Sequence, residues 1–178
     1  MRESIENYTP QTELKGIKRL AFLAWSIGFS LIFVWIFVIL LAPVAAENNW
    51  TNVSAAIYKI FSFLCHQMPS RSFHIENHAF AVCSRCFGIY FGLLCGFILY
   101  FFIRNIEEIE PIPRVWLFLA LIPIGTDWAL TAFDIWENTH FSRFLTGMIL
   151  GITCAIYIVP ALVELVRLLS NKSKRLSN

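Results

Sequence analysis

Four long apolar runs constrain what this 178-residue chain can become. They cover about residues 20–44, 79–103, 115–136 and 144–169. A helix needs roughly 20 residues to cross the hydrocarbon core of a bilayer, so each run is long enough for one transmembrane span. Only 15% of the residues are charged and 57% are hydrophobic, whereas a soluble domain usually carries about a quarter charged residues. The sequence therefore predicts a membrane protein.

The runs lack the alternation of apolar and polar residues that a membrane β-barrel requires, so helices must satisfy the backbone in lipid. We expect one all-α domain, residues 1–178, a polytopic membrane protein with four transmembrane helices and the lipid bilayer as its partner. Polar tails are expected at 1–19 and 170–178, and a kink or break near Pro160. We expect no nucleic-acid partner.

The longest connection, residues 45–78, contains a short apolar segment of its own. Residues 53–64 are too few to span a bilayer, so they predict an interfacial or re-entrant helix. The first run exceeds the roughly 7–15 residues of a signal-peptide core, so we expect it to remain as an anchor.

The basic residues predict an orientation for the spans. With the N-terminus in the cytoplasm, ten of the Lys and Arg residues lie inside and four lie outside. Because cytoplasmic loops carry the excess of positive charge, both termini are expected in the cytoplasm. The connection 45–78 is then on the outer face.

Two groups of metal-binding side chains flank the second half of that connection. Cys83 and Cys86 are spaced i,i+3 and share one face of a helix, and Cys65 and His66 precede them across a loop. Three thiolates and one imidazole are a tetrahedral zinc ligand set. We therefore predict an outer-face site, most simply for zinc, with His74 and His78 as alternative nitrogen donors. Cu(I) is an alternative ion because Met68 is a soft neighbour.

Two other interpretations fit the same cysteines. Cys83 and Cys86 at a helix N-terminus, next to Arg85, could cycle between dithiol and disulfide with Cys65 as exchange partner. For a membrane thiol–disulfide oxidoreductase of this kind, a quinone is an alternative cofactor. Alternatively, the protein is a non-enzymatic scaffold or accessory subunit whose cysteines only staple the outer loop. Cys95 and Cys154 each stand alone in a span and are expected to be fillers.

Four ionisable residues are expected near the cysteines, namely Arg71, Arg85, Asp127 and Arg143. A charge inside a membrane costs several kcal/mol unless it is paired or hydrated. Asp134 is expected to reach Arg143 or Arg85, whereas the deeper Asp127 has a less obvious partner. The four residues predict either ion pairs that fix helix register or a polar pocket for an anionic headgroup, a quinone or a metal complex. A metal ion or a small membrane-soluble ligand is thus a possible partner.

Glycines recur every four residues on two of the spans. Such small faces let helix backbones approach closely in lipid, so the second span is expected to make a close helix contact, with the fourth span as candidate partner. The glycines are Gly88, Gly92 and Gly96 on the second span and Gly147 and Gly151 on the fourth.

The motifs Cys65-His-Gln67, Arg71-Ser-Phe73 and Cys83-Ser-Arg-Cys-Phe-Gly-Ile-Tyr90 resemble those of a known family. It is a prokaryotic family of small integral membrane proteins catalogued as a domain of unknown function. The resemblance covers about residues 60–152 and implies a polytopic protein of a prokaryotic cytoplasmic membrane with a linked cysteine site. Asn77-His78 stands where the family pattern implies a glycine-containing turn. Residues matching the downstream pattern are Pro123, Asp127, Arg143, Gly147 and Gly151.

Overall fold

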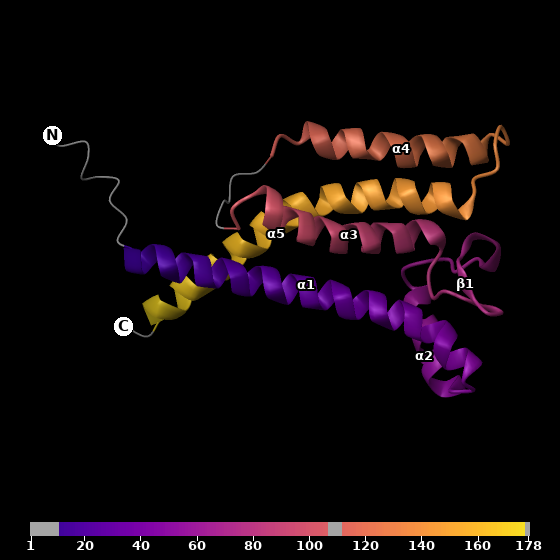
Figure 1. The fold of residues 1–178 in the computed structure, drawn as a ribbon, viewed down its shortest axis with the longest axis horizontal. Coiled ribbons are helices and arrows are strands. Elements are labelled where there is room, and N and C mark those ends of the chain that lie inside the picture. The colour runs from indigo at the N-terminus through magenta and orange to yellow at the C-terminus, as the bar shows by residue number, and fades with distance from the viewer. Residues whose placement is uncertain (1–10, 107–111, 177–178) are drawn as a thin grey trace.

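The computed structural model describes residues 11–106 and 112–176, with the side chains of 16–106 and 112–170. Four of its helices are long and apolar enough to cross a membrane, which confirms the all-α polytopic membrane fold. A fifth, shorter helix follows the first span (Figure 1). The helices are α1 Gln11–Glu47, α2 Thr51–Ser62, α3 Ser84–Ile103, α4 Val115–Ala132 and α5 His140–Leu176.

The helix ends differ from the limits of the apolar runs. Helix α1 begins at Gln11 and α5 continues to Leu176, so much of both expected polar tails is helical. A helix can extend beyond the hydrocarbon core because its backbone hydrogen bonds are internal. Helix α4 ends at Ala132, short of the expected 136, because Phe133 and Asp134 turn back onto its last carbonyls. Residues 1–10, 107–111 and 177–178 lie outside the described part of the chain.

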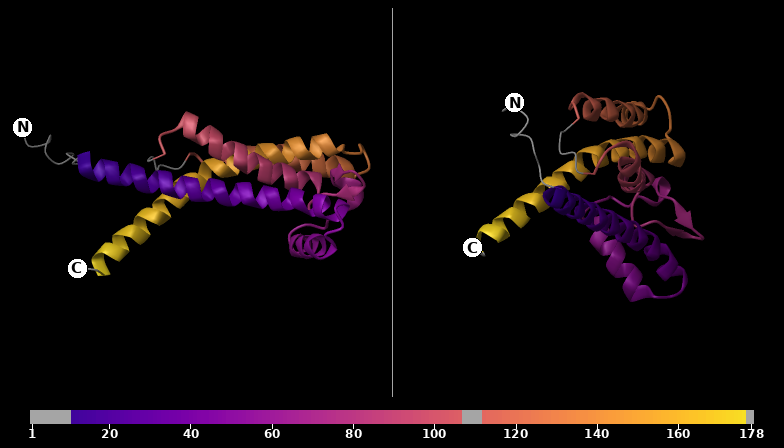
Figure 2. Two further views of the ribbon diagram at one scale, coloured as in Figure 1. Left: turned by 60° about the horizontal axis from the view of Figure 1, so that its bottom comes forward. Right: turned by 60° about the vertical axis from the view of Figure 1, so that its left-hand side comes forward.

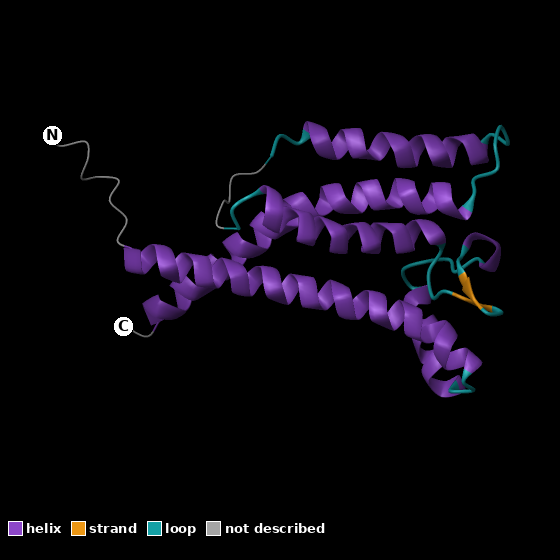
Figure 3. Ribbon diagram, in the orientation of Figure 1, coloured by secondary structure: helices purple, strands orange, loops and turns teal. Residues whose placement is uncertain are grey.

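A small β-hairpin precedes α3, where the sequence predicted only loop and the start of a span. Strands β1 (His74–Ile75) and β2 (His78–Ala79) pair antiparallel, and Glu76 takes a left-handed φ of 51° in the turn. A short 3-10 helix, η1 (Pro69–Arg71), leads into it. Figure 3 shows these strands as the one orange element beside the helices.

Helices α3 and α5 pack backbone against backbone. A Cβ placed on Gly92 would fall on the Met148 carbonyl oxygen, and one on Gly151 would fall on the Ile89 carbonyl oxygen. A Cβ on Gly96 would lie 2.5 Å from Cβ of Ala155. The glycines on both helices are therefore the reason for this close approach, and the fourth span is the partner of the second.

The other spans surround the α3–α5 pair. Helix α1 packs against α2, α3 and α5, whereas α4 packs against α5. In Figure 1, α4 lies along one edge of the bundle, and the right-hand view of Figure 2 shows it apart from α1. Helix α5 passes through Pro160 without interruption. It changes direction toward its C-terminus in both views of Figure 2, as a proline kink would produce.

One end of the bundle gathers the loops that carry the cysteines. Here the C-terminal end of α1, helix α2, the hairpin and the first turns of α3 and α5 come together (Figure 1). Both described chain ends lie at the opposite end. We call the first of these the cysteine end, formed by residues 48–86 and 128–144.

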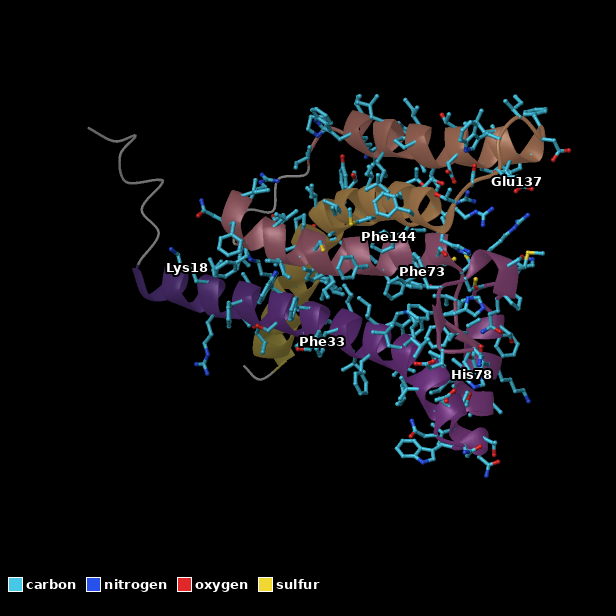
Figure 4. The ribbon with its side chains drawn as sticks, turned by 45° about the vertical axis from the view of Figure 1, so that its right-hand side comes forward. Lys18, Phe33, Phe73, His78, Glu137 and Phe144 are labelled. Carbon is cyan, nitrogen blue, oxygen red and sulfur yellow. The ribbon has the colours of Figure 1, made fainter. Side chains whose placement is uncertain are left out.

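Aromatic rings fix the hairpin to the bundle at the cysteine end. The Phe73 ring lies 6.0 Å from the Phe144 ring of α5 and 6.2 Å from the Phe87 ring of α3, measured between centroids. Phe80 of the hairpin stacks edge-on against Phe87 at 5.1 Å. Figure 4 labels Phe73 and Phe144, which lie next to each other at this end. The loop is therefore held by packing on both sides and forms a defined platform for the cysteines.

Candidate metal centre

The sulfur atoms of Cys65, Cys83 and Cys86 lie within 4.8 Å of one another. Cys65 ends the turn after α2, Cys83 stands immediately before α3, and Cys86 lies in the first turn of α3. None of the five cysteines of the chain is in a disulfide. The sequence expectation that two distant segments would bring three sulfurs to one point therefore agrees with the geometry.

Gln67 holds the first of these segments in place. Its side-chain amide donates to the Tyr58 carbonyl and to the Ala81 carbonyl, both at 2.8 Å. One hydrogen bond reaches back to α2 and the other reaches across to the residues before α3. Gln67 itself takes a left-handed φ of 48°, which turns the chain sharply after Cys65. A single amide thus ties the Cys65 turn to the Cys83 turn.

The second segment brings a helix N-terminus to the sulfurs. The backbone N–H of Cys83 donates to the Cys65 sulfur at 3.2 Å. Hydrogen bonds with the Cys65 and Cys86 thiols hold the pKa of Cys83 below its usual range, and the amides of Cys86 and Arg85 act in the same direction. A thiolate is the form that binds metal. The cluster therefore favours the ligating form of Cys83.

Ser84 connects the start of α3 to two other segments. Its hydroxyl donates to the Arg71 carbonyl at 2.9 Å and lies 3.0 Å from Nδ1 of His140. Because the single hydroxyl proton is used toward Arg71, the His140 Nδ1 must carry the proton of the second hydrogen bond. Ser84 is fully buried. It thereby fixes the first turn of α3, and with it Cys86, against the loop and α5.

Arg85 points toward α4 and pairs with Asp127. Its guanidinium Nη2 lies 2.5 Å from the Asp127 carboxylate, whose side chain is only 8% exposed. The Asn138 amide donates to the Asp127 carbonyl. The expectation that Asp134 would take an arginine partner is wrong for Arg85, because α4 ends before Asp134 and leaves its side chain exposed. The deeper carboxylate is the one that is paired, as an ionisable group in a membrane requires.

A cavity of about 410 Å3 opens beside the three sulfurs. It lies between the Cys65 turn, the start of α3, the end of α4 and the start of α5. Three of the four expected polar residues, Arg71, Arg85 and Arg143, line it together with the cysteines, whereas Asp127 is not among its lining residues. The remaining lining residues are Leu64, His66, Gln67, Met68, Trp128, Thr131 and Ala132.

His66 lines the cavity but does not join the sulfur cluster. Among the described residues, the cluster of candidate ligand atoms contains the three sulfurs and no histidine nitrogen, and the His66 side chain is exposed. The two alternative nitrogen donors do not join the sulfur cluster either. His74 is exposed, and Nε2 of His78 lies 3.4 Å from a Glu47 carboxylate oxygen. His66 as fourth ligand stays a prediction.

Sequence reasoning missed several residues that build this site. Gln67 was seen only as part of a motif, and Ser84 and His140 were assigned no part in holding the cysteines together. Trp128 and Thr131 reach the cavity because α4 ends beside it. The serine between Cys83 and Arg85 is a sequence signal that could have pointed to Ser84, since serines near helix starts favour side-chain hydrogen bonds to the backbone.

Fold and site together define a class, a small polytopic α-helical membrane protein with a three-cysteine cluster that could bind a metal ion. A family model described as "Predicted membrane protein (DUF2085)" matches residues 65–157, from the first cysteine of the cluster into α5. The chain belongs to this family of prokaryotic membrane proteins.

Two archaeal relatives are similar over most of their own length. "Uncharacterized protein MJ1492" of Methanocaldococcus jannaschii is 41% identical over 146 residues, which are 79% of this chain and 91% of the relative. An "Uncharacterized protein" of Methanothermobacter thermautotrophicus is 35% identical over 96 residues, 54% of this chain and 85% of the relative. No solved structure matches the chain.

Proposed function

We propose that Cys65, Cys83 and Cys86 bind one thiophilic metal ion, with zinc as the first candidate and Cu(I) as the alternative. The observation that carries this proposal is the mutual approach of the three sulfurs to within 4.8 Å. In a tetrahedral zinc site with Zn–S bonds of about 2.3 Å, neighbouring sulfurs are about 3.8 Å apart. Small side-chain rotations are enough to reach that geometry.

A metal ion held by the three sulfurs would have its fourth ligand position open to the cavity, because all three cysteines line that cavity. Three protein ligands with an open position are the arrangement of catalytic or ligand-binding zinc sites, whereas closed sets of four are structural. His66 lines the same cavity and could close the set by a change of rotamer. The proposal therefore favours a metal site that binds a further small ligand at its fourth position. His66 would occupy that position when no such ligand is bound.

Metal content of the purified protein tests the proposal. Protein purified anaerobically in detergent and loaded with zinc should retain about one equivalent after gel filtration, and Cys65→Ser, Cys83→Ser or Cys86→Ser should each lose it. Cys95→Ser and Cys154→Ser are matched controls, because those cysteines lie in α3 and α5 outside the cluster. Retention of the metal in all three cluster variants would refute the assignment.

The orientation is part of the same proposal. We infer that the cysteine end faces away from the cytoplasm, because most Lys and Arg residues belong to the opposite end and the tails. Fusions at the C-terminus report the side directly. A fluorescent protein should fluoresce there and alkaline phosphatase should stay inactive; the reverse pattern would put the site in the cytoplasm.

A redox function is the second candidate, and the approach of the Cys83 and Cys86 sulfurs at the N-terminus of α3 favours it. In the oxidation, the Cys83 and Cys86 thiols lose two protons and two electrons and form one disulfide bond. A quinone would accept the two electrons and the two protons and become a quinol. Free-thiol titration of metal-free protein with and without a soluble quinone tests this: loss of two thiols together with quinol absorbance supports it. Unchanged thiols would exclude it.

A further inference from the structure

We propose that the cavity beside the three sulfurs is a binding site for a phosphate-type oxyanion, held chiefly by Arg71 and Arg143. This deepens the proposed function by naming the ligand class of the same site, and it rests on that function only for contact between the anion and the metal. The geometry that points to it is the convergence of three guanidinium groups on one cavity of about 410 Å3.

The three arginines come from three different segments of the chain. Arg71 ends the 3-10 helix, Arg85 lies in the first turn of α3 and Arg143 lies in the first turn of α5. Segments so far apart in sequence bring like charges together at a cost, because the charges repel one another. Arg85 and Arg143 are half-buried, whereas Arg71 is exposed. The charges of Arg71 and Arg85 act unfavourably on the Arg143 guanidinium, and the Asp127 carboxylate and Cys83 act on it in the opposite direction. Such an arrangement is stabilised when an anion occupies the space between them.

The protein supplies too few negative groups to balance these charges. Asp127 neutralises Arg85, and a Cys83 thiolate, which lines the same cavity, would balance only one of the two remaining arginines. Within the part of the chain that the structure describes, the side chains of Arg71 and Arg143 have no carboxylate within ion-pair distance. In addition, Nε of Arg85 is buried and has no hydrogen-bond partner among the described residues, so Asp127 does not satisfy that guanidinium completely. The cavity thus has an excess of both positive charge and donors.

Charge on a bound zinc ion does not remove this excess. A divalent ion with three thiolates carries one net negative charge, which balances only one of the two unpaired arginines. An oxyanion at the open fourth position would then meet a metal ion on one side and guanidinium groups on the other. Guanidinium groups match the tetrahedral oxyanions in geometry, because two parallel N–H donors can reach two oxygens.

The remaining wall of the cavity suits a phosphate group and is not acidic. Trp128, Met68 and Leu64 supply apolar surface. Thr131 of α4 also lines the cavity, but its hydroxyl donates to the Asp127 carbonyl at 3.4 Å. The volume is within the range of about 300–1,000 Å3 typical of small-ligand sites. Because α4 faces lipid, the phosphate could come from a lipid headgroup or from a free ion. The shared chemistry is the phosphate oxyanion.

Binding of inorganic phosphate to the zinc-loaded protein tests the site. The full chain in nanodiscs of zwitterionic phosphatidylcholine should bind phosphate saturably at one site, measured by calorimetry in a phosphate-free buffer. Arg143→Gln and Arg71→Gln should each weaken binding by about tenfold or more, the effect of losing one charged hydrogen bond. Arg143→Lys should bind between wild type and Arg143→Gln. Arg114→Gln, an exposed arginine at the start of α4, is the control and should bind as wild type.

A second arm distinguishes the two sources of phosphate. The protein is also placed in nanodiscs that contain phosphatidic acid. If the site binds lipid headgroups, phosphatidic acid should suppress the binding of free phosphate. If the site binds the free ion, the affinity for phosphate should be unchanged. Absence of saturable binding in both lipid compositions would overturn the inference, as would binding that Arg143→Gln and Arg71→Gln leave unchanged. Thermal unfolding of each variant confirms that it is folded.

Zinc analysis of the same samples separates this inference from the proposed function. Zinc at about one equivalent without phosphate binding rejects the anion site and leaves the metal site standing. Phosphate binding to Cys83→Ser protein without zinc supports the anion site and rejects the metal as its necessary partner.

Discussion

Helices α3 and α4 are both apolar spans of similar length, yet they are held in the bundle in different ways. Helix α3 buries its glycine face, and three glycines bring its backbone against α5. Helix α4 buries only Ala120 and Asp127 among its residues. Its main polar ties are the Arg85–Asp127 ion pair and the hydrogen bond from Asn138 to the Asp127 carbonyl.

This difference in packing indicates that the α3–α5 pair provides stability, whereas α4 borders the space for a ligand. Backbone packing between α3 and α5 leaves no space, so this pair forms a rigid core that positions Cys83, Cys86 and Arg143. Helix α4 is anchored near one residue and leaves a cavity against the cysteine end. A lightly packed helix beside a rigid pair is suited to admit a ligand, because local opening there costs less than opening the core.

The largest expected effect comes from breaking the glycine face of α3. Gly92→Leu would place side-chain atoms on the Met148 carbonyl of α5, so the helices must separate. We expect a loss of about 3 kcal/mol or more in stability. Gly125→Leu is the control, since a Cβ on Gly125 meets no atom within 4 Å. Thermal unfolding in detergent, followed by gel filtration, measures both. Equal stability of the two variants would contradict the assignment of the core.

Removing the anchor of α4 should have a smaller effect. Asp127→Asn leaves Arg85 partly buried without a counter-charge, and breaking a buried pair costs about 3–5 kcal/mol. Since the Arg85 side chain is 24% exposed, solvent screening reduces this cost, and we expect a loss of about 2 kcal/mol in the free energy of unfolding. Asp134→Asn changes an exposed carboxylate and should leave thermal stability unchanged. If Asp134→Asn proves the more damaging substitution, the assigned pair is incorrect.

The smallest expected loss of stability comes from the hydrogen bond between Asn138 and the Asp127 carbonyl of α4. Asn138→Ala removes the amide that donates to the Asp127 carbonyl, and loss of one such hydrogen bond costs about 1 kcal/mol. Glu137→Ala, the exposed neighbour labelled in Figure 4, is the control. Limited proteolysis of the loop between α4 and α5 should be faster in Asn138→Ala than in Glu137→Ala. Identical cleavage rates would show that Asn138 does not restrain α4.

Much of the fold follows from sequence because lipid imposes simple rules. Uninterrupted apolar runs must be helices, and the family resemblance drawn from the cysteine motifs is confirmed by the match to residues 65–157. The glycine spacing also predicted the close contact of the second span. These features depend on local pattern alone, so no knowledge of distant contacts was needed.

The parts that sequence did not predict depend on where elements end. The expected partner of an arginine was Asp134 because the third span was drawn to Trp136; α4 stops at Ala132, and Asp134 takes a left-handed φ of 53° in the turn. The hairpin was missed because each of its strands has two residues and shows no alternation. The cooperation of Gln67 and Ser84 arises only once loops from three segments meet.

X-ray absorption spectroscopy at the zinc edge identifies the atoms bound to the metal ion. In the zinc-loaded protein we expect three sulfur ligands at about 2.3 Å and one nitrogen or oxygen ligand at about 2.0 Å. The Cys83→Ser variant should lose this signature, and the Cys95→Ser variant should keep it. Zinc surrounded only by nitrogen and oxygen in the wild-type protein would contradict the claim that the three clustered sulfurs form the metal centre.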